Sequence, residues 1–425
     1  MKRHVRRLVK AVVAGIVLLV AIGATADSQV RIMRLSAVEG YVMADRHTGQ
    51  GFERALVNMP ITQGMLLHTG EDGYAEVELE EGTTIRLAPN TQIDFQELSL
   101  RDSGGKATTV RFSEGTVYLN VRHLKGDNFT LAVAEQNLPV THTAHFRVEF
   151  ADHKLKLAVY SGDLRVKRDG NQVKVKKGEE LTLDLAENSS LLAKDITPSP
   201  YDSWDEQRSR YHQQYYFDSD YSSYPYYGRG DLNYYGSWYD VAGYGSLWQP
   251  YGMTLGWSPF GAGGWGWYTG FGYTWISPYP WGWLPFHYGS WVWVPGWGWG
   301  WLPGSYWGTW GLFPIIVNPP IGFVAPRPPR LPNRPLILSN NGLNRSFLSI
   351  PGLVAHNDLI ASSGTQTPAA TSTPIRPPIV MATPFRSFQG GNMSYGFGSR
   401  SSHAAGGSGS GHGGTGGGGG HSGGH

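Results

Sequence analysis

The sequence predicts an all-β protein that ends in a disordered tail. Three observations predict this: apolar and polar residues alternate with period two over residues 30–186, a Trp- and Gly-rich unit repeats over residues 234–310, and the last stretch is nearly all Gly, Ser and His. The chain has 425 residues with 58 Gly and 27 Pro, the two residue types that interrupt regular structure. A core can therefore form over only part of its length.

Residues 1–26 predict a signal peptide. Basic residues from Lys2 to Lys10 precede the apolar run Ala11–Gly23, and the small residues Ala24-Thr25-Ala26 stand directly before Asp27, the expected first residue after cleavage. The apolar run is short for a membrane-spanning helix, which needs about 20 residues. We therefore expect a periplasmic or extracellular protein of the cell envelope. An uncleaved single-pass anchor is the alternative, and only then would the chain be held in a membrane.

Charge and cysteine content exclude several classes of function. The formal net charge is +2, and removal of the basic residues 1–26 leaves a mildly acidic protein, which offers no electrostatic footprint for nucleic acid. The absence of Cys excludes disulfides, a lipid-attachment thiol and thiolate metal sites. The protein is expected to be stable in an export compartment without covalent cross-links.

Residues 27–195 predict a β-domain, built as a sandwich or as a short solenoid. In stretches such as Ala75–Leu79 and Phe146–Phe150, alternation predicts strands with one buried and one wet face. A Gly-containing phrase recurs and is interpreted as a turn that starts a strand. It stands at Glu39-Gly40-Tyr41-Val42, Glu114-Gly115-Thr116-Val117 and Ser161-Gly162-Asp163-Leu164.

This segment also carries a family pattern. The matching residues are Val38-Glu39-Gly40, Met59-Pro60-Ile61, Leu67-His68-Thr69-Gly70, Gly73-Tyr74-Ala75, Glu81 to Leu87, Glu114 to Val117, Tyr160-Ser161-Gly162 and Lys177-Gly178-Glu179. In this order they resemble the FecR domain. The family's founding members are membrane regulators of iron-uptake signalling, with a cytoplasmic sigma-factor-binding segment before the membrane span. Only residues 1–10 precede the apolar run here, too few for a folded segment of that kind.

Residues 196–233 predict a linker with one short helix. Ser203 and Glu206 fit a capping box, and an amphipathic helix is expected from Trp204 to Tyr216. The Tyr-rich, acidic stretch that follows is expected to be coil.

Residues 234–310 predict three aromatic β-hairpins. The unit Trp-x4-Gly-x-Gly-x2-Trp, followed shortly by Pro, starts at Trp238, Trp265 and Trp291. The Gly positions supply the positive φ of a tight turn, and the flanking aromatic residues are strand formers. No Lys, Arg, Asp or Glu occurs from Val241 to Pro326, so stacked rings should replace an aliphatic core.

The repeat resembles the uncharacterised DUF6600 family, which often follows a FecR domain. The residues that carry this resemblance are Asp231 to Trp238, Trp248-Gln249-Pro250, Phe286 to Trp291 and Val294-Pro295-Gly296. This family has no assigned activity, so the resemblance implies no function.

Residues 311–425 predict a disordered tail, first Pro-rich and then rich in Gly and His. Runs such as Pro326-Arg327-Pro328-Pro329-Arg330 favour polyproline II, and the stretch from Gly406 cannot bury enough apolar surface to offset the entropy of ordering.

The sequence predicts no catalytic residues, no cofactor and no defined metal site. It contains no His-Glu-x-x-His motif, and the Trp-rich repeat has no carboxylate for glycosidase chemistry. Strand alternation would place His142 and His145 on opposite faces, with His153 further along. The tail histidines, interpreted as solvated, are His403, His412, His421 and His425.

A ligand platform of aromatic rings is the sharpest functional hypothesis. Alternation places Trp291 and Trp293 on one face, and places Trp297, Trp299 and Trp301 together on one face. His287 and Tyr288 are candidate polar partners for a sugar stacked on these rings. The alternative is that the rings form the core.

These observations predict an exported, non-enzymatic envelope protein that binds or scaffolds, with an envelope protein or a glycan as its partner. A membrane-anchored signalling regulator of the FecR type is the alternative function.

Overall fold

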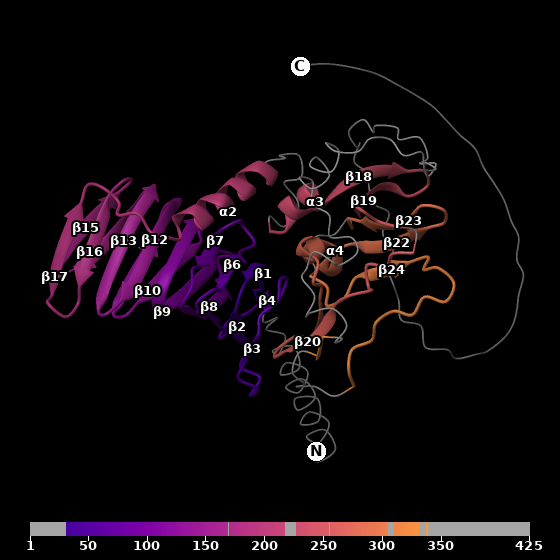
Figure 1. Ribbon diagram of the computed structural model, residues 1–425, viewed down its shortest axis with the longest axis horizontal. Helices are drawn as coiled ribbons and strands as arrows, with labels where there is room; N and C mark the ends of the chain where they lie inside the picture. The colour runs from indigo at the N-terminus through magenta and orange to yellow at the C-terminus, as the bar shows by residue number, and fades with distance from the viewer. Residues whose placement is uncertain are drawn as a thin grey trace, which may run out of the picture. The chain divides into compact units, whose positions relative to one another are not determined.

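The computed structural model describes residues 31–168, 170–216, 227–254, 256–304, 310–330 and 337–338. It confirms a predominantly β architecture (Figure 1). The expected signal peptide, residues 1–26, and the tail from residue 339 onward lie outside the described residues.

Seventeen strands of the described chain form the first part of the fold. They are β1 Met33–Glu39, β2 Val42–Asp45, β3 Phe52–Arg54, β4 Pro60–Ile61, β5 Leu66–Thr69, β6 Tyr74–Glu78, β7 Thr84–Leu87, β8 Thr91–Leu100, β9 Lys106–Val121, β10 Asn128–Val133, β11 Gln136–Val140, β12 Ala144–Ala151, β13 Lys154–Ser161, β14 Asp163–Arg168, β15 Asn171–Lys176, β16 Glu180–Asp184 and β17 Ser189–Ala193.

These strands form a sandwich of two layers around one apolar core, rather than a solenoid. One layer has the order β17-β16-β13-β12-β9-β7-β6-β1-β4. The other runs β3-β2-β5-β8-β9-β10-β11, and the β14–β15 hairpin lies beside β11. Strand β9 belongs to both layers: its first half pairs with β8 and β10, and its second half pairs with β7 and β12.

The passage of β9 between the layers occurs at a glycine. Gly115 has φ +100°, and a Cβ there would lie 2.4 Å from the carbonyl oxygen of Asn90. Gly40 and Gly162 occupy turns between strands, as predicted. The interpretation of Gly115 as a turn that starts a strand is wrong, because this glycine bends one continuous strand.

The prediction of a wet outer face is also wrong for the layer that contains β6, β7 and β12. Val77 and Ile85 point into the apolar core, as alternation requires. Their neighbours Glu76, Arg86 and Arg147 point the other way and are nevertheless buried. Helix α2, Asp202–Tyr215, covers this face and excludes water from it (Figure 1).

The predicted helix is confirmed, but its start and its cap differ from the prediction. The helix begins at Asp202 instead of Trp204, and no side chain caps its N-terminal residue, so the Ser203–Glu206 capping box does not form. The Asp202 carboxylate instead accepts a hydrogen bond from the backbone N–H of Ser199.

The second part of the fold contains the aromatic repeat. Its elements are α3 Arg229–Tyr235, β18 Gly236–Val241, β19 Gly245–Pro250, β20 Gly264–Tyr268, β21 Gly272–Ile276, the 3₁₀ helix η1 Pro280–Gly282, α4 Trp283–His287, β22 Ser290–Val294, β23 Gly298–Leu302, β24 Ile315–Val317 and β25 Ile337–Leu338.

The three predicted hairpins are confirmed. In each one the first Trp of the repeat lies directly opposite the last: Trp238 faces Trp248, Trp265 faces Trp275, and Trp291 faces Trp301. The turn glycines of all three have positive φ, such as +100° at Gly270 and +77° at Gly296. Strands β18, β19, β23, β22 and β24 form one sheet in that order (Figure 1), and β21, β20 and β25 form another.

The stretch that follows residue 311, predicted to be part of the tail, is ordered at its start. Strand β24, Ile315–Val317, pairs in parallel with β22, so the backbone just after the repeat belongs to the aromatic sheet. The side chains explain why: Phe313 and Ile316 pack against the aromatic core. Apolar residues before the Pro-rich run are enough to hold this stretch on the sheet.

Candidate functional site

The residues predicted as a ligand platform lie around one sheet of the aromatic repeat. On β22 and β23, Trp291 faces Trp301 and Trp293 faces Trp299. On the other side of β23, Trp301 lies opposite Trp248 of β19. Directly opposite residues project to the same face of a sheet. The first and last Trp of the first and third hairpins therefore lie in one row across the sheet.

Most of the Trp rings on this face are core. Trp291 and Trp301 have no exposed surface, and Trp299 keeps 2 %. They pack in one aromatic cluster with side chains of η1 and α4. Trp293 is half-buried, and Trp238, at the edge of the row, keeps 41 % of its surface exposed. Of the predicted platform rings on this face, only Trp293 offers ring surface to a ligand, joined by Trp238, which the prediction did not include.

Trp297 lies on the opposite face, which corrects the predicted grouping with Trp299 and Trp301. It packs with Leu247 and covers Gly300, where a Cβ would come within 2.6 Å of the indole. Trp297 stands in the turn between Gly296 and Gly298, both of which have positive φ. Strict alternation holds only along an extended strand, so it fails across this turn.

The two predicted polar partners are buried beneath the aromatic sheet. His287 Nδ1 donates to the carbonyl oxygen of Gly311 at 2.8 Å, and its ring stacks on Trp310 at 4.4 Å between centroids. Burial lowers the pKa of His287 to about 3, so the ring is neutral. The hydroxyls of Tyr288 and Tyr227 lie 3.2 Å apart. These groups stabilise the core and do not face solvent.

A second group of chemistry-bearing side chains crosses the outer face of the sandwich in a straight row. Glu76 on β6 lies opposite Arg86 on β7, Arg86 opposite Tyr118 on β9, and Tyr118 opposite Arg147 on β12. All four side chains are buried. Charges are rarely buried without partners, so each must be compensated from above the sheet.

Helix α2 supplies the partners. Asp205 accepts hydrogen bonds from Arg86 at 2.6 Å and contacts His145 Nε2 at 2.8 Å. Asp202 accepts a hydrogen bond from Arg147 at 2.7 Å, and from the hydroxyls of Tyr118 and Tyr160. The helix is therefore attached through carboxylates rather than through an apolar stripe.

The pKa values of this layer follow from its partners. Burial alone would raise the pKa of Glu76, but Arg208, His212 and Arg86 outweigh burial and hold it well below its usual range. Arg208 and His212, both on α2, lie 2.6 Å and 2.9 Å from the Glu76 carboxylate. The pKa of Asp205 is lowered for the same reason, by His145 and Arg86 against the effect of burial.

Buried polar contacts also join the sandwich to the aromatic repeat. Arg34 on β1 donates to Asn58 at 2.9 Å and pairs with Asp231 of α3 at 2.5 Å. Asn58 Nδ2 in turn donates to the carbonyl oxygen of Tyr279 at 2.6 Å. Burial raises the pKa of the neighbouring Glu78 to about 8, which Arg34 offsets only in part.

This arrangement holds elements together and leaves little room for chemistry. The buried carboxylates with shifted pKa values are enclosed between sheet and helices, where no substrate can reach them. In the described part of the chain no group of three His, Asp or Glu is arranged to hold a metal ion, and His145 is paired with Asp205. None of the helices within the described ranges is long and apolar enough to cross a bilayer.

Solved structures offer only a distant similarity to part of this chain. Two crystal structures of a candidate anti-sigma factor from Parabacteroides distasonis ATCC 8503 are similar, each at 17 % sequence identity. The first covers 31 % of this chain and 59 % of its own length with a TM-score of 0.27, and the second covers 37 % and 70 % with a TM-score of 0.28. The comparison with curated proteins finds no match.

Two family models match within the chain. Residues 65–165 match the FecR protein family, which covers the centre of the sandwich from β5 to β14. Residues 229–314 match DUF6600, a family of unknown function, which covers the aromatic repeat from α3 onward. The chain therefore carries a FecR domain followed by a DUF6600 domain.

Proposed function

We propose that the chain is an exported, non-enzymatic protein of the cell envelope that binds or scaffolds other envelope components. The N-terminal pattern before Asp27 supports export, and the absence of Cys suits a protein that does not depend on redox conditions. The partner is an envelope glycan or an envelope protein.

The observation that carries the proposal is the burial of Trp248, Trp291 and Trp301, which have no exposed surface. These rings build a folded body instead of an open catalytic cleft. The Arg34–Asp231 and Asn58–Tyr279 contacts attach this body to the FecR sandwich. Two folded parts attached in this way can hold a bound partner in a fixed position, which suits a scaffold.

A capture experiment, in which the protein is immobilised and retains envelope components from solution, tests the proposal. The mature chain, Asp27 to His425, is incubated with peptidoglycan, envelope polysaccharides and envelope protein extract. We expect selective retention of one envelope component, and no consumption of that component over time. Retention of nothing from any of these preparations contradicts the proposal, and turnover of a retained glycan contradicts its non-enzymatic part.

A pair of variants tests whether the exposed rings of the aromatic sheet take part in binding. Trp238→Ser with Trp293→Ser removes the two rings available on that face. Tyr41→Ser with Phe52→Ser is the matched control, because these aromatic side chains are also exposed but lie on the sandwich. If the rings contact the ligand, only the first pair weakens capture.

The FecR match also keeps a second function open, that of a membrane-anchored signalling regulator. That function requires residues 1–26 to stay attached, so the N-terminus of the protein in the envelope distinguishes the two.

A further inference from the structure

A tight turn after β24, at residues 320–324, holds two aliphatic side chains out in solvent. The backbone N–H of Phe323 donates to the carbonyl oxygen of Pro320 at 3.0 Å and closes the turn. Gly322, with φ +83°, stands in its third position, which suits a type II turn. Ile321 at the tip has an exposed fraction of 107 %, and Val324 has one of 79 %. In the described part of the chain, these are the two most exposed of the large apolar side chains.

Phe323 fixes this turn to the aromatic sheet. Its ring lies 5.2 Å from the buried Trp299 ring and 5.7 Å from the Phe260 ring, measured between centroids. Trp293 of β22 contacts the same Trp299 ring at 5.6 Å. Phe260, Trp293 and Phe323 are each half-buried and form an aromatic patch that reaches solvent. The two exposed aliphatic residues therefore flank a ring of this patch, and they form part of one apolar surface.

The charge that accompanies this surface is positive. No Asp or Glu occurs from residue 241 to residue 357, and the two cations that follow the turn, Arg327 and Arg330, are exposed. Polyproline II, which the sequence favours here, has three residues per turn and would place both guanidinium groups on one side. An apolar tip followed by cations suits a partner with an anionic surface and an apolar interior.

An anionic lipid bilayer has both properties. Its hydrocarbon takes up aliphatic side chains, its interface favours Trp rings, and its phosphate groups attract Arg and Lys. A protein partner would need a preformed pocket for the protruding Ile321, whereas lipid chains rearrange around such a side chain.

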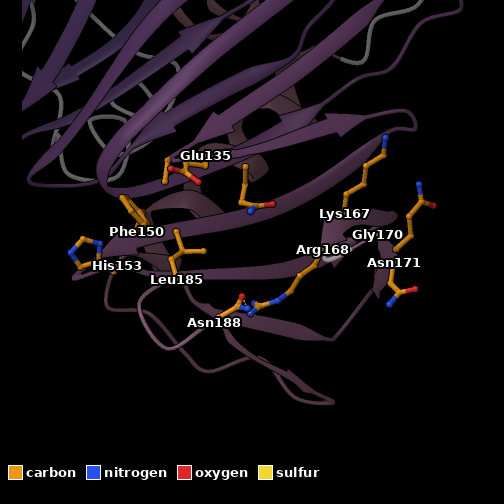
Figure 2. A pocket seen from close by; sticks show the side chains of 12 residues that line it. Glu135, Phe150, His153, Lys167, Arg168, Gly170, Asn171, Leu185 and Asn188 are labelled. Atoms are coloured by element: carbon orange, nitrogen blue, oxygen red, sulfur yellow. Dashed lines mark hydrogen bonds between the residues drawn. The ribbon is translucent and has the colours of Figure 1, made fainter.

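A groove of about 800 Å³ at the end of the FecR sandwich lacks this combination. Its lining includes the acid Glu135 as well as the cations Lys167 and Arg168, and Figure 2 shows the two cations pointing in different directions. The groove therefore has no clear preference for an anionic partner. Lys167 is exposed, so it provides a control for cations elsewhere on the chain.

We propose that the turn at residues 320–324 binds the surface of an anionic lipid bilayer. Ile321 and Val324 insert among the lipid chains, the aromatic patch lies at the interface, and the two arginines pair with lipid phosphates. This contact goes beyond the binding of a glycan or an envelope protein. It is peripheral, so it does not require residues 1–26 to stay attached.

Vesicle sedimentation tests the proposal with the mature chain, Asp27 to His425, which lacks the apolar run of the signal peptide. The probes are vesicles of phosphatidylcholine alone and vesicles in which about one third of the lipid is phosphatidylglycerol. We expect roughly tenfold or more tighter binding to the anionic vesicles, and a weaker preference at high salt, because the attraction is partly electrostatic. No binding to the anionic vesicles would overturn the proposal.

A pair of serine variants tests the apolar part of the contact. Ile321→Ser should weaken binding to the anionic vesicles about tenfold, because an inserted aliphatic side chain is lost. The melting temperature should not change, since this side chain packs on nothing in the folded protein. Leu191→Ser is the matched control, because Leu191 of β17 is also 67 % exposed but lies on the sandwich. Equal losses in the two variants would overturn the proposal.

A pair of double variants tests the charged part. Arg327→Gln with Arg330→Gln should remove most of the preference for phosphatidylglycerol. Arg165→Gln with Lys167→Gln removes the same charge from exposed positions of β14 and should keep that preference. If both double variants lose it equally, any cation on the chain serves and the proposal is overturned.

The absence of Cys from the chain allows a direct measurement of insertion. Ile321→Cys and, as its control, Leu191→Cys are each labelled with nitrobenzoxadiazole, which emits more strongly in apolar surroundings. On anionic vesicles we expect a several-fold rise in emission from the label at residue 321 and constant emission from the label at residue 191. Constant emission at residue 321 would overturn the proposal. So would a result in which Ile321→Ser impairs capture of an envelope protein and leaves vesicle binding unchanged, since the turn would then be a protein interface.

Discussion

Arg86 on β7 donates a 2.6 Å hydrogen bond to Asp205 of α2, and both side chains are buried. The two residues lie 119 positions apart in the sequence, and the pair joins the FecR sandwich to the helix that follows its last strand. It shows that the stretch expected to be a linker is part of the folded domain.

Removal of the Asp205 carboxylate should therefore be costly. Asp205→Ala removes one of the two carboxylates that pair with the buried Arg86, and breaking a buried pair from one side costs about 3–5 kcal/mol. Chemical denaturation of the variant measures the loss in the free energy of unfolding. Glu206→Ala is the control, because Glu206 is exposed in a surface pair with Arg210 and should change that free energy by less than about 1 kcal/mol. Similar losses in both variants would mean that α2 is not held by its buried face.

A fragment that ends before α2 should be much less stable than one that includes it. Residues 27–195 contain every strand of the sandwich, yet they leave Glu76, Arg86 and Arg147 without their helix partners. We expect residues 27–216 to melt at least about 10 °C higher than residues 27–195, as several kcal/mol implies for a domain of this size. Circular dichroism at rising temperature provides the comparison. Equal melting temperatures would show that the folded domain ends at residue 195, as the sequence predicts.

Glu76 and Glu78, two residues apart on β6, should have opposite effects on pH dependence. The pKa of Glu78 is about 8 in the folded protein against 4.5 as its ordinary value, so the folded state binds the extra proton and stability falls as pH rises between these values. Glu78→Gln should remove this loss, and its stability relative to the parent should increase from pH 5 to pH 8.5.

For Glu76 the sign is reversed. Its folded pKa is lowered, so its contribution is present above pH 4.5 and is lost as pH falls below that value. Glu76→Gln should thus be most destabilising near neutral pH, and the deficit should shrink toward pH 3. Urea denaturation at each pH measures the stability of both variants. If the two variants depend on pH in the same way, the opposite pKa shifts of Glu76 and Glu78 are contradicted.

Trp299 and Trp293 face each other across β22 and β23, but only Trp299 is fully buried. Trp299→Ala should lower the free energy of unfolding by about 3–5 kcal/mol through the cavity it leaves. Trp293→Ala should cost clearly less, since part of that ring is already in solvent. Thermal melts of the two variants compare their losses of stability. An equal loss would show that Trp293 also belongs to the core.

The aromatic hairpins could be predicted from the sequence because their signal is local. Each repeat holds the turn glycines and both facing Trp within a few residues, as Trp291 and Trp301 illustrate. Which rings are buried could not be predicted, since burial depends on η1 and α4 packing on the sheet from elsewhere. The same limit explains Trp297, whose face is set by the turn and not by alternation.

The docking of α2 could not be predicted because its buried face is polar. A search for apolar periodicity misses a helix that is held by Asp202, Asp205, Ser209 and His212. Their spacing does follow one helical face, so charge periodicity combined with charged residues on the strands was the available signal.

N-terminal sequencing of the protein from the envelope fraction tests export to the cell envelope most directly. We expect the sequence to begin at Asp27, after removal of residues 1–26. A protein that keeps its N-terminal residues, starting at Met1 and held in the membrane, would contradict export by cleavage and would favour a membrane-anchored regulator instead.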